Sequence, residues 1–84
     1  MTKSKYDGLY IWLKRSAVSG VRVTFTQVEF VLGFALPATA RSKRQWWANE
    51  SKPTHHVQSR SWKRAGFRTA KVDLASETLD FVRA

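Results

Sequence analysis

Cationic, aromatic and amide side chains are concentrated in the stretch RSKRQWWANESKPTHH, which covers residues 41–56. Arginine and lysine bind phosphates, and a guanidinium group can form two hydrogen bonds to the edge of guanine. Asparagine and glutamine suit adenine, and an exposed indole ring stacks on unpaired bases. These residue types therefore predict contacts with nucleic acid.

Basic residues continue from this stretch to Arg68. Residues 41–68 contain eight basic residues and the single acid Glu50, whereas the remaining residues contain seven bases and five acids. The net charge of +9 is thus concentrated locally, and a local excess directs an electrostatic field toward polyanions. The candidate nucleic-acid-binding residues are Arg41, Lys43, Arg44, Gln45, Trp46, Asn49, Lys52, Arg60, Lys63, Arg64 and Arg68.

His55 and His56 are the other residues of this stretch whose type could do chemistry. A metal site needs three or four converging ligands, but neighbouring helical side chains diverge and the chain has no cysteine. A catalytic histidine needs a positioned carboxylate, and Asp73, Glu77 and Asp80 show no diagnostic spacing. We therefore predict no catalytic residue, no metal and no cofactor, hence no enzyme. The histidines are assigned to a helix start or a phosphate contact.

The elements that position these residues are expected to form one domain. The chain has 84 residues, too few for two separate cores, and 43% of them are hydrophobic. It has no cysteine for a disulfide framework, and no apolar run approaches the roughly 20 residues that cross a bilayer. We therefore expect a globular, cytoplasmic protein with no membrane contact and no evident small-molecule substrate.

The first expected elements are a helix and a strand. Ser4 and Asp7 have the spacing of a capping box, so the first helix is predicted to begin at Ser4. Lys14 and Arg15 suit its C-terminal end, where the helix dipole favours cations. Residues 21–24 alternate and are rich in β-branched side chains, which predicts a short strand.

A second helix is predicted over residues 26–32. Thr26 and Glu29 have capping-box spacing, and Phe25 and Phe30 have the spacing of a hydrophobic staple. Gly33 can adopt the left-handed conformation that commonly ends a helix. The pattern thus predicts where the helix begins and where it ends.

Proline is favoured at the first helical position, so a third helix is predicted from Pro37 to about Trp47. Two short helices joined by a glycine-led turn are typical of a helix-turn-helix, which makes residues 37–47 the candidate recognition helix. Adjacent helical residues point about 100° apart. We therefore assign Trp47 to the core together with Trp62. Trp46 is either partly exposed, where its indole could stack on an unpaired base, or packed like Trp47, which the shortness of the chain favours.

The C-terminal part predicts a further helix and a hairpin. The helix should run from about residue 54 or 55 to Ala65, with Gly66 ending it and a basic face opposite Trp62. Residues 67–74 and 78–83 alternate and are separated by a turn, which predicts a β-hairpin.

This order of elements predicts an α+β fold of winged-helix type. It has three or four short helices, including the helix-turn-helix, and a small antiparallel sheet that ends in the C-terminal β-hairpin. In such a fold the first strand joins the later hairpin. The additional helix before the hairpin departs from that pattern and indicates either an insertion or a different α+β arrangement.

Motifs distributed over nearly the whole chain resemble those of a family of small uncharacterised prokaryotic domains. The motifs are Tyr6-Asp7-x-Leu9-Tyr10, Phe25-x-x-Val28-Glu29-x-x-Leu32-Gly33-x-x-Leu36-Pro37, Trp46-Trp47-Ala48-Asn49 and Trp62-x-x-Ala65-Gly66-Phe67. The resemblance implies a stable single-domain unit of bacteria, archaea or their mobile elements. It implies no mechanism.

The sequence therefore predicts a small basic protein that binds nucleic acid, with double-stranded DNA as the expected partner. A homodimer is compatible with this prediction because one short recognition helix reads few base pairs. A transcriptional regulator or an accessory protein of a mobile element would fit. The alternative is a protein–protein interaction module or inhibitor whose basic face docks on an acidic partner, since both functions need the same field.

Overall fold

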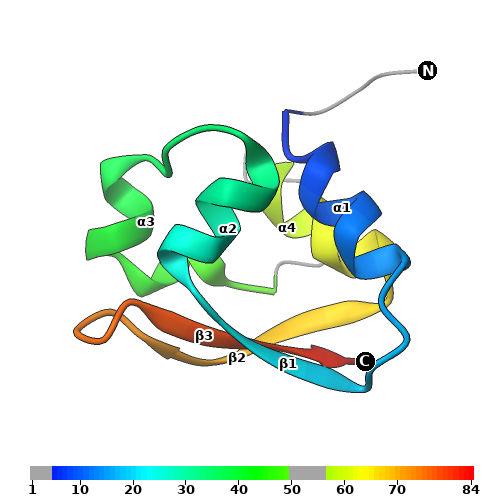
Figure 1. The fold of residues 1–84 in the computed structure, drawn as a ribbon. Helices are drawn as coiled ribbons and strands as arrows, with labels where there is room; N and C mark the ends of the chain where they lie inside the picture. Colours follow the sequence, from blue (N-terminus) through cyan, green and yellow to red (C-terminus); the bar gives the residue numbers. More distant parts are fainter. Residues whose placement is uncertain (1–4, 50–56) are drawn as a thin grey trace.

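Four α-helices pack on one face of a three-stranded sheet in the computed structural model, which describes residues 5–49 and 57–84 (Figure 1). The described residues fold as an α+β domain, as the sequence predicts. The elements are α1 (Asp7–Lys14), β1 (Gly20–Thr24), α2 (Phe25–Leu32), α3 (Ala38–Ser42), the 3-10 helix η1 (Arg44–Trp47), α4 (Val57–Arg64), β2 (Phe67–Asp73) and β3 (Thr78–Arg83).

The sheet is antiparallel, with strand order β1-β3-β2. The predicted hairpin is confirmed, and the first strand pairs with it through β3, where Val23 lies opposite Leu79. Buried and exposed residues alternate along the strands, because one face of the sheet packs against the helices and the other faces solvent.

α1 begins at Asp7, later than predicted. Tyr6 occupies the N-cap position and provides no side-chain hydrogen bond to the helix. Ser4, the predicted cap, lies outside the described residues. Leu9 and Leu13 are buried, at helical spacing, and fix α1 on the core.

The N-terminus of α2 differs from the prediction by two residues. Thr24 caps the helix: its Oγ1 accepts from the Gln27 N–H at 3.0 Å, and the Thr24 N–H donates to Gln27 Oε1 at 2.7 Å. This is a capping box, and it replaces the predicted pair of Thr26 and Glu29. Gly33 ends the helix with a φ of 85°, as predicted.

The predicted staple between Phe25 and Phe30 is wrong for the same reason. With the cap at Thr24, the staple positions fall on Val23 and Val28, and both are buried. Phe25 is fully buried, whereas Phe30 is 89% exposed. The shifted cap therefore leaves one large aromatic side chain in solvent.

The single predicted helix over residues 37–47 is instead two short segments. Lys43 is extended, with φ −129° and ψ 119°, and separates α3 from η1. Neighbouring residues on a continuous α-helix diverge by about 100° and cannot both face one core. The break allows Trp46 and Trp47 both to be buried, with ring centroids 4.7 Å apart.

Aromatic rings form the centre of the core. Trp47 stacks on Phe25 at 5.0 Å and on Trp62 at 6.1 Å, and Trp62 lies 5.7 Å from Phe81. Trp47 and Trp62 are at most 1% exposed, which confirms their assignment as core residues. No helix among the described residues is long and apolar enough to cross a membrane.

Candidate nucleic-acid interface

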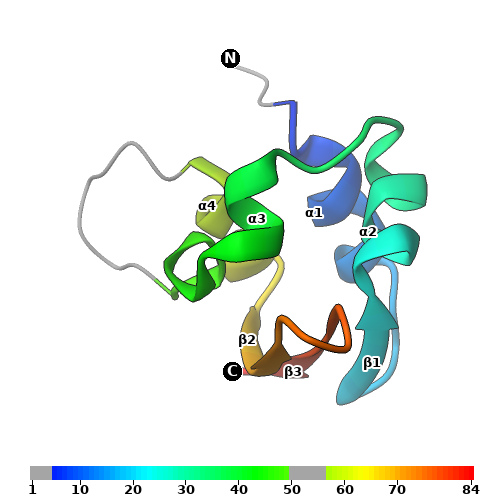
Figure 2. The same cartoon turned by 90° about the vertical axis from the view of Figure 1, so that its left-hand side faces the viewer.

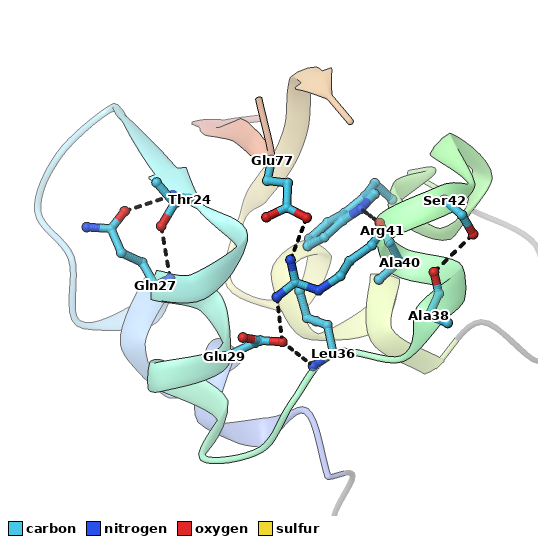
Figure 3. A network of polar contacts seen from close by, with 10 residues as sticks. Thr24, Gln27, Glu29, Leu36, Ala38, Ala40, Arg41, Ser42 and Glu77 are labelled. Carbon is cyan, nitrogen blue, oxygen red and sulfur yellow. Dashed lines mark hydrogen bonds and ion pairs between the residues drawn. The ribbon is translucent and has the colours of Figure 1, made fainter. Parts of the chain in front are cut away.

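Arg41 joins α3 to α2 and to the turn between β2 and β3 (Figure 3). Its Nη2 lies 2.8 Å from Glu29 Oε2, and its Nη1 lies 2.6 Å from Glu77 Oε2. Glu29 Oε2 also accepts the Leu36 N–H at 2.7 Å. Arg41 was predicted to contact nucleic acid, but its guanidinium is engaged by two carboxylates of its own chain.

These contacts also stabilise the charged form of Glu29. The hydrogen bond from Arg41, and then the one from the Leu36 N–H, hold the pKa of Glu29 below its ordinary value. The hydrogen bonds to Glu77 and Glu29 raise the pKa of Arg41 in turn. The polar contacts of Arg41 with Glu29 and Glu77 therefore connect elements that are distant in sequence.

Trp46 is 8% exposed, which confirms the alternative that both indoles are packed and excludes a partly exposed Trp46. Its ring packs against Tyr6 at 5.8 Å and against Trp47. Its backbone carbonyl accepts from Gln58 Nε2 at 2.9 Å, which places η1 against α4. In this position the Trp46 ring is not available to stack on a base.

Asn49 connects three parts of the fold through its side-chain amide. Its Oδ1 accepts from Trp62 Nε1 at 3.0 Å and from the N–H and Oγ1 of Thr69 at 2.9 and 3.1 Å, and its Nδ2 donates to the Thr69 carbonyl at 3.1 Å. Each side-chain atom is thus satisfied within the protein. The geometry gives Asn49 a structural role.

The exposed side chains of residues 58–64, in α4, are all cationic. Arg60, Lys63 and Arg64 are exposed, whereas the other side chains of residues 58–64 are buried. The spacing of i, i+3 and i+4 places the three on one side of the helix. The Arg64 guanidinium carbon lies 4.5 Å from the ring centroid of Tyr10 on α1, within the range of a cation–π contact. Tyr10 was not among the predicted site residues, because its sequence spacing indicated only a buried helix face.

Lys43, Arg44 and Gln45 are exposed at the start of η1. The hydrogen bond between Gln58 and Trp46 brings this segment next to α4, and Figure 2 shows the two neighbouring each other. The hydrogen bonds from Ser76 lower the pKa of Asp73, and the positive charge of Arg44 adds a smaller effect in the same direction. Of the predicted site residues, these three and the cations of α4 are therefore the ones that the fold brings nearest to a single continuous surface.

Arg68 lies on a different face. Phe67 and Thr69 on either side of it are buried beneath the helices, so the alternation of a strand directs Arg68 to the opposite face of the sheet. Opposite it on β3 is Val82. The predicted binding surface is therefore divided, and Arg68 does not lie with α4.

Lys52, His55 and His56 lie outside the described residues. Within residues 5–49 and 57–84, no group of three or more histidines or acids is arranged to hold a metal ion. Asp80, one of the acids considered as a partner for histidine, bonds Arg22 Nε at 2.9 Å, and this contact lowers the pKa of Asp80.

The described ranges carry a large excess of basic over acidic residues. Residues 5–49 and 57–84 contain thirteen bases and five acids. Ion pairs join two of these bases, Arg22 and Arg41, to three of the acids, Asp80, Glu29 and Glu77. The charge of the described residues therefore remains strongly positive after these contacts are formed.

The Trp-Trp-Ala-Asn motif and the later Trp-x-x-Ala-Gly motif are structural in this protein, because Trp46, Trp47, Asn49 and Trp62 build the core and its main hydrogen-bonded junction. No curated protein and no solved structure matches the chain. Residues 6–84 match the family described as a domain of unknown function, DUF7662. The chain therefore belongs to this family.

Proposed function

We propose that this protein binds nucleic acid, with duplex DNA as the partner, through phosphate contacts made by α4 and the start of η1. The observation that supports the proposal is that the exposed side chains of residues 58–64 are Arg60, Lys63 and Arg64. Lys43 and Arg44 extend the cationic surface along the neighbouring segment. Phosphate contacts position a protein on a duplex and require no specific base sequence.

A winged-helix-like arrangement is part of this proposal. The order of helix, strand, two helices and hairpin, with β1 paired to β3, is compatible with it, and α4 would be an insertion before the hairpin. In this arrangement α3 would be the recognition helix. Because α3 has only five residues and its Arg41 is engaged internally, we assign affinity to phosphate contacts rather than to base reading.

Titration of a fluorescently labelled random duplex over a series of salt concentrations tests the proposal. If about five phosphates are neutralised, log K should fall with log salt with a slope of about −4.5. Arg60→Gln combined with Lys63→Gln should weaken binding about tenfold at moderate salt and reduce the magnitude of the slope by about 2.

Arg68→Gln combined with Lys71→Gln is the matched control, since it removes the same charge from another part of the surface. It should leave most of the affinity intact. Equal losses in the two double variants would refute the assignment to α4. If the wild-type protein fails to bind duplex even at low salt, nucleic-acid binding is wrong and an acidic protein partner becomes the better explanation of the charge.

A further inference from the structure

Exposed apolar side chains gather on the side of the molecule formed by α1, α2 and β1. Phe30 is 89% exposed, Ile11 50% and Trp12 36%. Phe30 and Trp12 line two adjoining hollows. We name this surface, composed of Ile11, Trp12, Val21, Phe30 and Val31, the Phe30 face. Contiguous exposed apolar surface of this kind usually marks an interaction site.

The first hollow lies between α1 and α2 and has a volume of about 600 Å³. Gly8 forms part of its wall, and a Cβ added there would lie 3.0 Å from the Val31 carbonyl oxygen. The absence of a side chain at Gly8 therefore allows α1 and α2 to approach closely. The second hollow lies between Trp12, α2 and β1. Phe30 borders both hollows.

A projecting ring beside a hollow makes a surface complementary to itself. In a two-fold symmetric pair, each protomer presents the same patch, so the Phe30 ring of each can enter a hollow of the other. The free edge of β1, the terminal strand of the sheet, lies on the same side (Figure 2). We propose that the Phe30 face is the surface through which two copies of this chain associate.

The two hollows have a largely uncharged lining, which suits the same apolar face of a second copy. Among the described residues, the charged ones that line the two hollows are Arg15 and Arg22, and Arg22 is paired with Asp80. α4, which carries the exposed Arg60, Lys63 and Arg64, lies on the other side of the helical layer from β1 and α2 (Figure 2). Two Phe30 faces can therefore meet without bringing the main positive surfaces together.

A dimer interface of standard size would occupy a modest part of the protein surface. A standard interface covers about 800 Å² on each partner. The protein exposes 5501 Å² in total, so such an interface would cover about 15% of its surface. The pairing would leave both α4 surfaces outside the contact, and it does not depend on nucleic-acid binding.

Sedimentation equilibrium of the full chain without nucleic acid, over a wide range of protein concentrations, tests the proposal. The wild-type protein should show a reversible monomer–dimer equilibrium. Phe30→Glu should weaken dimerisation at least tenfold, because it places a charge in each apolar hollow. The circular dichroism spectrum of this variant should be unchanged, since the Phe30 side chain is largely exposed and contributes little to the core of the monomer.

Val18→Glu is the control, because Val18 is also an exposed apolar residue, at 46%, but does not line either hollow. It should dimerise as the wild type does. A wild-type protein that stays monomeric at all concentrations would overturn the proposal, as would equal effects of the two substitutions. Arg60→Gln with Lys63→Gln should dimerise normally, so failure of nucleic-acid binding and failure of dimerisation are distinguishable.

Discussion

Individual side chains show why residue type predicted the binding surface only in part. Arg41 and Asn49 have the chemistry of nucleic-acid contacts, but their partners are Glu29, Glu77 and Thr69. Glu77 and Thr69 are distant from them in sequence, so no local pattern indicates the pairing. Residue type reveals what a group can bind, whereas only the fold decides what it does bind.

The contact between Glu29 and Arg41 predicts a specific pH dependence. The pKa of Glu29 is lowered in the folded protein, so its contribution to stability is present above the ordinary glutamate pKa of about 4.3 and is lost as pH falls through the folded value. Glu29→Gln should therefore have a lower Tm than the wild type at pH 7. The difference between the two should narrow below about pH 4.

Thermal melts followed by circular dichroism between neutral and acid pH measure this difference. The comparison of two proteins with nearly the same charge separates the Glu29 contribution from general acid destabilisation. A gap in Tm that stays constant down to about pH 3 would exclude Glu29 as the titrating group.

At the scale of elements, the hairpin, the first strand and the end of α2 were predicted well, because alternation and Gly33 are local signals. The start of α2 was misplaced because Thr24 and Thr26 can both serve as caps. The break between α3 and η1 was missed because no local pattern indicates it. The break allows both Trp46 and Trp47 to be buried, which is a requirement of packing in the core. Local patterns thus predicted the elements better than their boundaries.

The observed cap can be distinguished from the predicted one by substitution. Thr24→Val keeps the shape and β-branching of the side chain but removes the oxygen that accepts from Gln27. We expect it to lower the free energy of unfolding by about 1 kcal/mol. Thr26→Val, at the predicted position, should have a much smaller effect. Urea denaturation measures both, and a larger loss for the Thr26 variant would contradict the assigned cap.

At the scale of the whole molecule, stability depends on a few stacked rings. A domain of 84 residues has one small core, so each large buried side chain contributes a substantial share of its stability. Trp62 lies between Trp47 and Phe81 and also donates to Asn49. It therefore joins the helical layer to the sheet both by packing and by a hydrogen bond.

Trp62→Ala should lower the free energy of unfolding by about 3–5 kcal/mol, the cost of emptying a large core site. Trp62→Phe retains an aromatic ring but loses the indole N–H that donates to Asn49 Oδ1. It should therefore lower the free energy of unfolding by a smaller amount, about 1–3 kcal/mol. Chemical denaturation gives both values. An alanine variant as stable as the wild type would show that the ring stack does not hold the fold together.

The sequence predicted the fold class and the core tryptophans, but not how charge is distributed over the folded surface. Arg68 and Arg60 are both basic and close in sequence, yet the strand places one on the solvent face of the sheet and the helix places the other above it. The basic residues that share one surface are therefore fewer than the basic residues of the segment 41–68.

The burial of three tryptophans has a practical consequence for optical spectroscopy. Trp46, Trp47 and Trp62 are at most 8% exposed, whereas Trp12, the fourth tryptophan, is 36% exposed and lies on the Phe30 face. A neutral quencher such as acrylamide should therefore reach mainly Trp12. The protein thus carries a built-in fluorescent reporter whose quenching should fall when that face is covered, with no added label.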